Sequence, residues 1–367
     1  MNWRKIARKP FQAVGIETPG ETARLLWRNL LGKPYYWANF PLVVQFETNN
    51  YCGPKYCGIL CEYCNPQRLL LQGKIRYAEM PMDQVKWVLR QIAMHRQELK
   101  EARKYGFGYY SPFLYGEALT DPRLPEVLKL GKQYMPDVTN NLFTSGVIPE
   151  NAWMLTKNLD WICVTFSAHT RELYKRVHKG DKFNAVVETM RYLTENCKSH
   201  QRLEVHYVIT KTNFAYLQDW YDFIGKEFPE WHRVFSPIVE GCGTTASTEA
   251  LGSLTMQQQV EAIRKVDPSS GFWNVETSML RQPCVLWHNA SITADGTLLQ
   301  CCTFSDPNTW NYGSIQDYMD NGYGLEDYWR VKLANRLNNV WCRNCNLRRP
   351  NWRERIGKIK FDVYVQP

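Results

Sequence analysis

The sequence alternates between short apolar segments and longer amphipathic segments from residue 42 to residue 241. The apolar segments are rich in β-branched and aromatic residues and have the length of buried strands. The amphipathic segments have helical periodicity. Such alternation predicts right-handed strand–helix–strand units and a parallel sheet. We expect an α/β fold, a partial (β/α)6 barrel of the TIM type, with strands at 42–48, 107–115, 138–144, 160–167, 202–210 and 233–241 and helices at 81–104, 124–135, 150–157, 181–195 and 214–227.

Residues that could carry chemistry follow the ends of the predicted strands. Four cysteines come after the first strand, Gly116-Glu117 after the second, Ser145 after the third and Ser167 after the fourth. In parallel barrels the carboxyl ends of the strands form the functional face. The sequence therefore predicts one site at that face.

The 12 cysteines are clustered. The basic N-terminal segment lacks the apolar core of a signal peptide, and no apolar run is long enough to span a membrane, so we expect a cytoplasmic protein. In a reducing compartment, clustered cysteines indicate metal binding or catalysis rather than disulfides. Cys163 lies within an apolar strand and is expected in the core. Cys242, between two glycines after the sixth strand, is a weak candidate for a hydrogen-atom donor or a substrate contact.

Cys57, Cys61 and Cys64 form a C-x3-C-x2-C array. Three thiolates on one loop can hold three irons of a [4Fe–4S] cluster and leave the fourth iron open. The array resembles the motif of the radical S-adenosylmethionine superfamily, which has an aromatic residue before the last cysteine, here Tyr63. The resemblance implies that S-adenosylmethionine binds the open iron. Cys52 directly follows the first strand and is the alternative first ligand, although the spacing favours Cys57.

The resemblance continues through the barrel. "LYGEALTDPRLPEVL" (114–128), "NNLFTSGVIP" (140–149) and the segment 164–190 are similar to the family's later barrel segments. The resemblance implies that the Gly and Glu of the first segment lie near the methionyl amino group and that Ser167 lies near the ribose. The cofactor-binding residues that it implies are Tyr63, Gly116, Glu117, Ser145 and Ser167.

A second group of cysteines lies in the last third of the chain. Cys284 and Cys301 flank Asp295-Gly296, a strong hairpin signal, and Cys342 and Cys345 form a C-x2-C pair. The arrangement resembles the SPASM/twitch extension of radical S-adenosylmethionine enzymes. It implies a small C-terminal α+β domain with one closed auxiliary [4Fe–4S] cluster on these four thiolates. Cys302 is an alternative to Cys301, and zinc is an alternative metal at this site.

These segments predict four regions: an N-terminal amphipathic helical extension (1–40), the barrel (41–242), a linker with a helix (243–283) and the cluster domain (284–367). The N-terminal helix either packs on the barrel or contacts an anionic membrane surface as a peripheral anchor. His169 and His178 are expected at the surface or in loops. The formal net charge is +9, but aromatic and basic residues do not interleave, so no nucleic-acid partner is expected.

The resemblance implies an enzymatic function. With two [4Fe–4S] clusters and a reducing partner such as flavodoxin or ferredoxin, the enzyme would cleave S-adenosylmethionine to a 5′-deoxyadenosyl radical that abstracts a substrate hydrogen atom. Oxidation or cross-linking of a peptide or protein is the favoured reaction. Dehydrogenation or epimerisation of a sugar or other small alcohol is one alternative. A zinc-binding interaction module is the alternative from another class.

Overall fold

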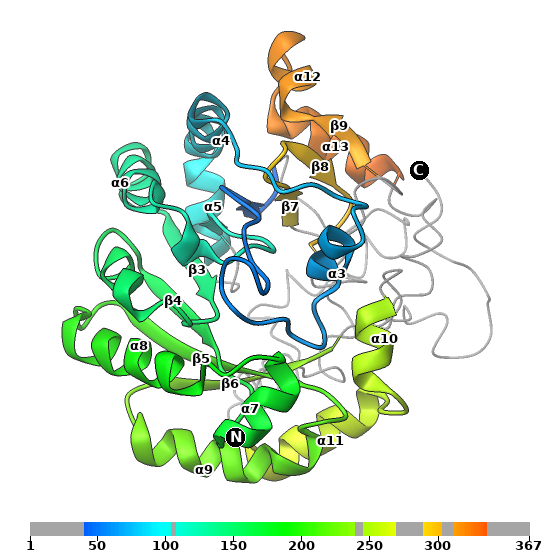
Figure 1. The fold of residues 1–367 in the computed structure, drawn as a ribbon. Helices are drawn as coiled ribbons and strands as arrows, with labels where there is room; N and C mark the ends of the chain where they lie inside the picture. Colours follow the sequence, from blue (N-terminus) through cyan, green and yellow to red (C-terminus); the bar gives the residue numbers. More distant parts are fainter. Residues whose placement is uncertain (1–39, 104–107, 239–244, 269–288, 303–310, 336–367) are drawn as a thin grey trace, which may run out of the picture.

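A computed structural model describes residues 40–103, 108–238, 245–268, 289–302 and 311–335 (Figure 1). Its strands form one nine-stranded sheet in the order β6-β5-β4-β3-β2-β1-β7-β8-β9. The six strands from β1 to β6 are parallel, as are β1 and β7. The strands are β1 Val43–Phe46, β2 Tyr109–Ser111, β3 Thr139–Thr144, β4 Trp161–Thr165, β5 Arg202–Ile209, β6 His232–Pro237, β7 Asn289–Ile292, β8 Thr297–Leu299 and β9 Asn311–Ser314.

Helices surround the curved sheet on its outer side (Figure 1). All six predicted strands are present in their predicted order, so the α/β fold with a partial barrel is confirmed. The α-helices are α3 Asn65–Leu71, α4 Met82–Met94, α5 Arg96–Ala102, α6 Leu124–Tyr134, α7 Arg171–His178, α8 Phe183–Asn196, α9 Leu217–Glu227, α10 Thr245–Leu251, α11 Met256–Val266, α12 Ile315–Asp320 and α13 Leu325–Asn335; the 3-10 helices are η2 Ala118–Thr120, η3 Pro149–Leu155 and η4 Phe214–Tyr216.

Two helices differ from their predicted form. The single helix expected at 81–104 is divided into α4 and α5 at His95, whose backbone leaves the helical region (φ −107°, ψ 17°). The His95 ring stacks on Phe40 at 4.1 Å and lies 3.1 Å from a carboxylate oxygen of Glu98, and these contacts accompany the break. The helix expected at 150–157 is the 3-10 helix η3.

The C-terminal hairpin continues the barrel sheet. β7 pairs with β1 in parallel, with Val43 opposite Asn289, and β8 returns antiparallel to β7. The turn at Asp295-Gly296 that the sequence predicts is therefore present, with Gly296 at φ 82°. The predicted division of the chain at residues 242, 243, 283 and 284 stays a prediction.

The two faces of the sheet differ in polarity. On β1, Val44 and Phe46 pack into a core cluster with α4, whereas Gln45 between them lines a cavity on the inner face. In the parallel register Gln45 lies opposite Ser111 and Ser291, and residues in register share a face. The inner face of the barrel is therefore polar where a fully packed barrel would carry apolar side chains.

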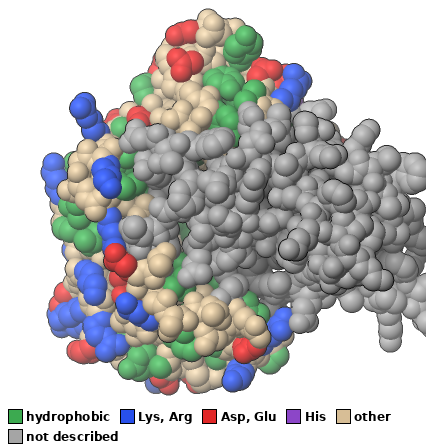
Figure 2. Space-filling model, turned by 90° about the vertical axis from the view of Figure 1, so that its right-hand side faces the viewer, with side chains coloured by type: hydrophobic (Ala, Val, Ile, Leu, Met, Phe, Trp, Pro, Cys, Tyr) green, Lys and Arg blue, Asp and Glu red, His purple; other side chains and the backbone are tan. Residues whose placement is uncertain are grey.

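Figure 2 shows one side of the molecule. On its described part, Lys and Arg side chains are spread among acidic and apolar ones rather than gathered in one stripe.

None of the helices described has both the length and the apolar character that crossing a bilayer requires.

Aromatic packing fixes the helices on the β4 side of the barrel. Phe166 directly follows β4, is fully buried and lies 5.2 Å from the ring of Phe183 and 5.9 Å from that of Tyr174. We predict that Phe166→Ala lowers the free energy of unfolding by about 3–5 kcal/mol, because it leaves a cavity at this junction. Chemical denaturation measures the loss. Trp153→Ala is the control: Trp153 is 50% exposed, and its removal should change stability by less than about 0.5 kcal/mol.

Candidate metal centre and cofactor site

The array Cys57, Cys61 and Cys64 lies in the loop between β1 and α3, at the carboxyl end of the barrel strands. The loop first folds back on itself, because the backbone N–H groups of Tyr56, Cys57 and Gly58 all donate to the carbonyl oxygen of Gly53 at 3.0–3.1 Å. This tight turn directs the Cys57 side chain into the interior, where it is buried.

Cys52 and Cys57 lie side by side. Their sulfur atoms are 3.2 Å apart, and the backbone N–H of Gly53 donates to Cys57 Sγ at 3.1 Å. The hydrogen bond from Cys52 lowers the pKa of Cys57, and the same bond raises the pKa of Cys52. Either sulfur can be the donor in this contact, so both thiols lie within reach of the same site, and the choice of Cys57 as the first ligand stays a prediction.

Helix α7 holds the second half of the array. Thr170 caps this helix by accepting a hydrogen bond from the Leu173 N–H, and the loop N–H groups of Leu60 and Glu62 donate to carbonyl oxygens in its last turn at 2.8 and 2.9 Å. Gly180 directly follows α7 and touches the loop, because a Cβ at this position would lie 2.5 Å from the carbonyl oxygen of Gly58.

His178 ends α7 and lies against Cys61. The prediction that it is a surface or loop residue is wrong: its side chain is fully buried, with Nδ1 3.1 Å from Cys61 Sγ. Burial lowers the pKa of His178 to about 3, so the ring is neutral. The sequence reading missed α7 as a separate helix, and the Thr170-Arg171-Glu172-Leu173 capping signal was the feature that could have revealed it.

The donor set suits a metal cluster. Burial raises the pKa of Cys64 to about 11 and raises the pKa of Cys61 well above its usual range, and repulsion from neighbouring thiolates adds to both effects, from Cys57 on Cys64 and from Cys64 on Cys61. Thiolates crowded in this way are stabilised by a bound cation, which displaces their protons. Cys57, Cys61 and Cys64 therefore fit a three-thiolate iron–sulfur cluster, for which the loop offers one short, anchored segment.

The strand ends beside the loop are joined by buried carboxylates. Glu47 accepts hydrogen bonds from the N–H groups of Tyr115 and Gly116 at 2.9 and 2.6 Å and from Ala294 N–H at 3.2 Å. Gly116 permits this approach, since a Cβ there would lie 2.4 Å from the carbonyl oxygen of Asn49.

Glu117 links the ends of the second and third strands. It accepts hydrogen bonds from Ser145 N–H at 2.7 Å, from Ser145 Oγ and from Thr144 Oγ1 at 2.5 Å, and from Leu119 N–H at 3.1 Å. The structure thus brings Gly116, Glu117 and Ser145 together at one edge of the barrel mouth.

The remaining predicted cofactor-binding residues lie at the same end. Ser167 follows β4 and is fully buried, and its hydroxyl oxygen accepts a hydrogen bond from Val208 N–H at 2.9 Å. Tyr63 is half-buried and meets His178 edge to face at 6.1 Å. The roles of these residues toward S-adenosylmethionine stay predictions.

The second cysteine group is described only at Cys301 and Cys302. Cys302 Sγ accepts a hydrogen bond from Asn289 Nδ2 at 3.6 Å. Asn289 begins β7, which runs parallel to β1, whereas Cys57 lies beyond the end of β1. These two described thiols therefore lie at the opposite end of the barrel from the array. The other candidates, Cys242, Cys284, Cys342 and Cys345, and the N-terminal extension lie outside the described residues.

A cavity of about 800 Å³ lies inside the barrel toward the amino ends of the strands, and Cys302 contributes to its lining. Its lining includes inward-facing polar residues of four strands, namely Gln45, Asn141, Glu204, His206 and Asn289. Buried polar atoms of Ser111, Asn141 and Ser291 have no hydrogen-bond partner among the described residues. This polar inner surface was not predicted from the sequence. Its signal was present as polar residues at alternate positions of predicted strands, such as "LVVQFET" and "RLEVHYVIT".

Neither a protein-family model nor a curated protein matches the chain. Several solved structures do. Streptococcus suis SuiB bound to the precursor peptide SuiA matches with a TM-score of 0.57 at 14% identity, over 95% of this chain and 80% of that one. SuiB bound to S-adenosylmethionine gives a TM-score of 0.56 at 15% identity, over 90% and 77%. Native anSMEcpe with bound AdoMet matches with a TM-score of 0.55 at 16% identity, over 79% of this chain and 83% of that one.

These neighbours are radical S-adenosylmethionine enzymes. The chain has the radical S-adenosylmethionine fold, and the resemblance drawn from its motifs is confirmed at the level of the fold. At these identities the similarity concerns the fold alone.

Glu47 provides a pH test of the strand-end geometry. Burial raises its pKa to about 7 from the ordinary 4.5, against the opposing effect of the three N–H donors. Between pH 4.5 and 7 the folded state holds a proton that the unfolded state has lost, so stability falls as pH rises through this window and is constant above it. The total change is about 3 kcal/mol.

We predict that Glu47→Gln removes this slope, because the amide does not titrate. The substitution should also lower the free energy of unfolding by about 1–2 kcal/mol at low pH, since the amide can place an NH2 group against the Ala294 N–H. Denaturation of both proteins at several pH values between 5 and 8 measures the difference. Parallel curves for the variant and the wild type would contradict the assignment.

Proposed function

We propose that this chain is a radical S-adenosylmethionine enzyme. The observation that carries the proposal is the gathering of Cys57, Cys61 and Cys64 on one anchored loop at the carboxyl end of a partial parallel barrel. Zinc-binding modules use similar thiols, but they have no need of the Gly116–Glu117–Ser145 edge beside them.

When bound, the [4Fe–4S] cluster and S-adenosylmethionine supply a 5′-deoxyadenosyl radical for removal of a hydrogen atom from the substrate. Cys57, Cys61 and Cys64 would hold the cluster, with Cys52 as a hydrogen-bond donor to Cys57. Gly116, Glu117 and Ser145 would form the edge that orients the cofactor, together with Tyr63 and Ser167. The barrel walls would keep bulk water from the reacting atoms.

A peptide or protein is the favoured substrate, which the enzyme would oxidise or cross-link. The polar inner face is evidence for a substrate with many hydrogen-bonding groups. Buried polar atoms without a partner among the described residues, such as Ser111 Oγ, could form hydrogen bonds with such a substrate. The SuiB structure contains a precursor peptide, and this supports a peptide over a small molecule. The same polar face would also suit the hydroxyl groups of a sugar or other small alcohol, which is the second candidate.

A second [4Fe–4S] cluster would take an electron from the substrate radical. Its proposed ligands are Cys284, Cys301, Cys342 and Cys345, with Cys302 as the alternative to Cys301. The place of Cys302 supports this division, because it lines the cavity and a substrate held there would lie beside the second site. Flavodoxin or ferredoxin in a reducing cytoplasm would supply the electrons.

The first experiment tests the array. Anaerobically reconstituted protein should hold about eight irons in two clusters and form 5′-deoxyadenosine with a strong reductant. Replacing Cys57, Cys61 and Cys64 together by Ala should remove about four of these irons and abolish 5′-deoxyadenosine. The matched control is Cys52→Ala, which should keep most of the iron and most of the 5′-deoxyadenosine formation.

Two results would count against the array. Stoichiometric zinc without acid-labile sulfide in the wild type would favour the interaction module. Loss of iron in Cys52→Ala but not in Cys57→Ala would identify Cys52 as the first ligand.

The second experiment tests the auxiliary site. A Cys342→Ala, Cys345→Ala double variant should still form 5′-deoxyadenosine, because a closed cluster has no vacant iron for S-adenosylmethionine. It should fail to complete an oxidised product from a candidate peptide, assayed by mass spectrometry. The variant must be soluble and monodisperse, since thiolate-bound metals also support folding. Full product formation by such a variant would assign the second site a structural role.

A further inference from the structure

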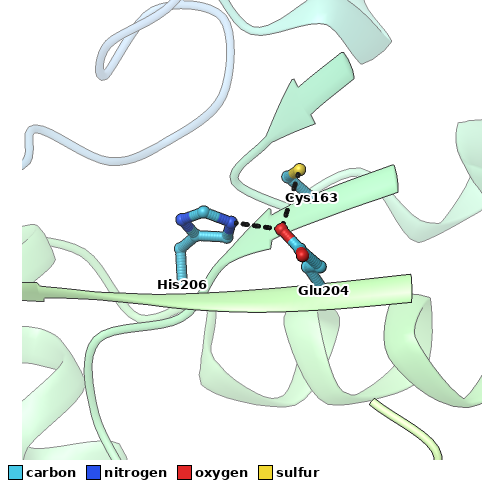
Figure 3. Close-up of side chains that lie close together, drawn as sticks. All are labelled: Cys163, Glu204 and His206. Atoms are coloured by element: carbon cyan, nitrogen blue, oxygen red, sulfur yellow. Dashed lines mark hydrogen bonds and ion pairs between the residues drawn. The ribbon is translucent and has the colours of Figure 1, made fainter. Parts of the chain in front are cut away.

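A second group of potential metal ligands lies inside the barrel. Cys163 on β4 and Glu204 on β5 lie directly opposite each other in the parallel register, and His206 follows two residues later on the same face of β5. The Cys163 Sγ lies 3.8 Å from Glu204 Oε2, and His206 Nε2 lies 3.1 Å from the same oxygen. Figure 3 shows the three side chains converging, with the carboxylate between the thiol and the imidazole.

We propose that Cys163, Glu204 and His206 form a divalent-metal site, best suited to Zn²⁺, separate from both predicted iron–sulfur sites. One sulfur, one oxygen and one nitrogen donor, all within 4.8 Å of one another, make a borderline-soft set of the kind that zinc binds. The inference does not depend on the proposed function, because it concerns other residues and another ion.

Two of the three separations between the donor atoms are close to those around a tetrahedral ion. Zinc–ligand distances of about 2.0 Å to N and O and about 2.3 Å to S require edges of about 3.3 Å between N and O and about 3.5 Å between S and O. The separations of 3.1 and 3.8 Å each differ from these values by about 0.3 Å or less. The Cys163 sulfur and the His206 nitrogen lie within 4.8 Å of each other, and rotation of these side chains would bring them to the tetrahedral edge of about 3.5 Å.

Outer partners hold two of the three ligands in place. His206 Nδ1 lies 3.1 Å from Ser236 Oγ, which can accept a hydrogen bond from the Nδ1–H tautomer, and this tautomer leaves the lone pair of Nε2 free to bind an ion. The Phe143 ring meets the imidazole edge to face at 4.9 Å. Arg202 pairs with the other carboxylate oxygen, Glu204 Oε1, which leaves Oε2 for the site.

The charges also balance. Glu204 would bind the ion as a carboxylate, with Arg202 paired to its other oxygen. Zinc binding would release the Cys163 thiol proton to solvent, so that Zn²⁺, thiolate and carboxylate sum to zero and Arg202 adds one positive charge. Such a site favours an anionic fourth ligand.

The fourth ligand would come from the cavity. Glu204 and His206 both line the cavity of about 800 Å³, whereas Cys163 is fully buried behind them. A zinc ion with an open coordination position that faces a cavity is typical of a site that binds a ligand. A structural zinc site has all four coordination positions filled by the protein. A carboxylate, alkoxide or thiolate of a molecule in the barrel is the class of ligand that we infer.

The test measures zinc on the full-length, cluster-loaded protein. Wild-type protein, exposed to Zn²⁺ anaerobically and desalted, should retain about one zinc more per chain than Cys163→Ala or His206→Gln. Each of these variants should weaken binding more than about 100-fold in a chelator competition, since outer partners alone contribute about 10- to 100-fold. The zinc K-edge X-ray absorption of the extra zinc, obtained as the difference between the wild type and these variants, should show a single sulfur atom bound to the ion.

Cys197→Ser is the matched control. Cys197 is a half-buried thiol at the end of α8, outside the ligand group, and its replacement should leave zinc content and affinity unchanged. Ser236→Ala removes no ligand, so it reports on the site even where Cys163→Ala fails to fold. It should weaken binding by about 10- to 100-fold.

Equal zinc affinity in the wild type, His206→Gln and Ser236→Ala would overturn the proposal. A zinc shell of three or four sulfurs that persists in Cys163→Ala would do the same, because it would place the ion on the clustered cysteines. Iron and sulfide, measured on the same samples, report separately on the radical S-adenosylmethionine function. Wild-type protein that binds no zinc beyond that of Cys163→Ala, while its iron and sulfide are retained, would therefore reject this site alone.

Discussion

The carboxylate of Glu47 joins the segments on which the barrel mouth depends. It is buried at the end of β1 and accepts backbone hydrogen bonds from Tyr115 and Gly116 after β2 and from Ala294 after β7. These are the strands on either side of β1 in the sheet. A single buried acceptor therefore sets the spacing of three strand ends beside the cysteine loop. The low dielectric of the site makes each of these hydrogen bonds stronger than it would be in water.

The barrel is polar inside and apolar outside. On β1, Val44 and Phe46 face the helices, and Gln45 faces the cavity. The outer face supplies the hydrophobic stabilisation, so the inner face is free to carry residues such as Glu204 and His206. The described thiols of the two cysteine groups lie at opposite ends of this polar interior.

Much of the fold could be predicted from sequence periodicity. The strands around "LVVQF", "WICVTF" and "LEVHYVI" are strongly apolar or β-branched, and each was found within a few residues of its position. The divided helix at His95 was not predicted, because the contact that accompanies the break is a stacking on Phe40, outside the helix. His178 was misplaced for a similar reason. Its burial follows from the packing of α7 on the cysteine loop, which no local pattern shows.

The sequence by itself determined the spacing of the cysteine array and the order of the strands, because thiol spacing and periodicity are local properties. It also placed Cys163 in the core, where the structure has it. Only the tertiary structure decided that Cys163 faces Glu204 and His206, since residues about 40 positions apart meet only through the register of parallel strands. The same register placed β7 beside β1 and so joined the C-terminal hairpin to the barrel. Non-local pairing of this kind depends on the closure of the whole sheet, and no short segment encodes it.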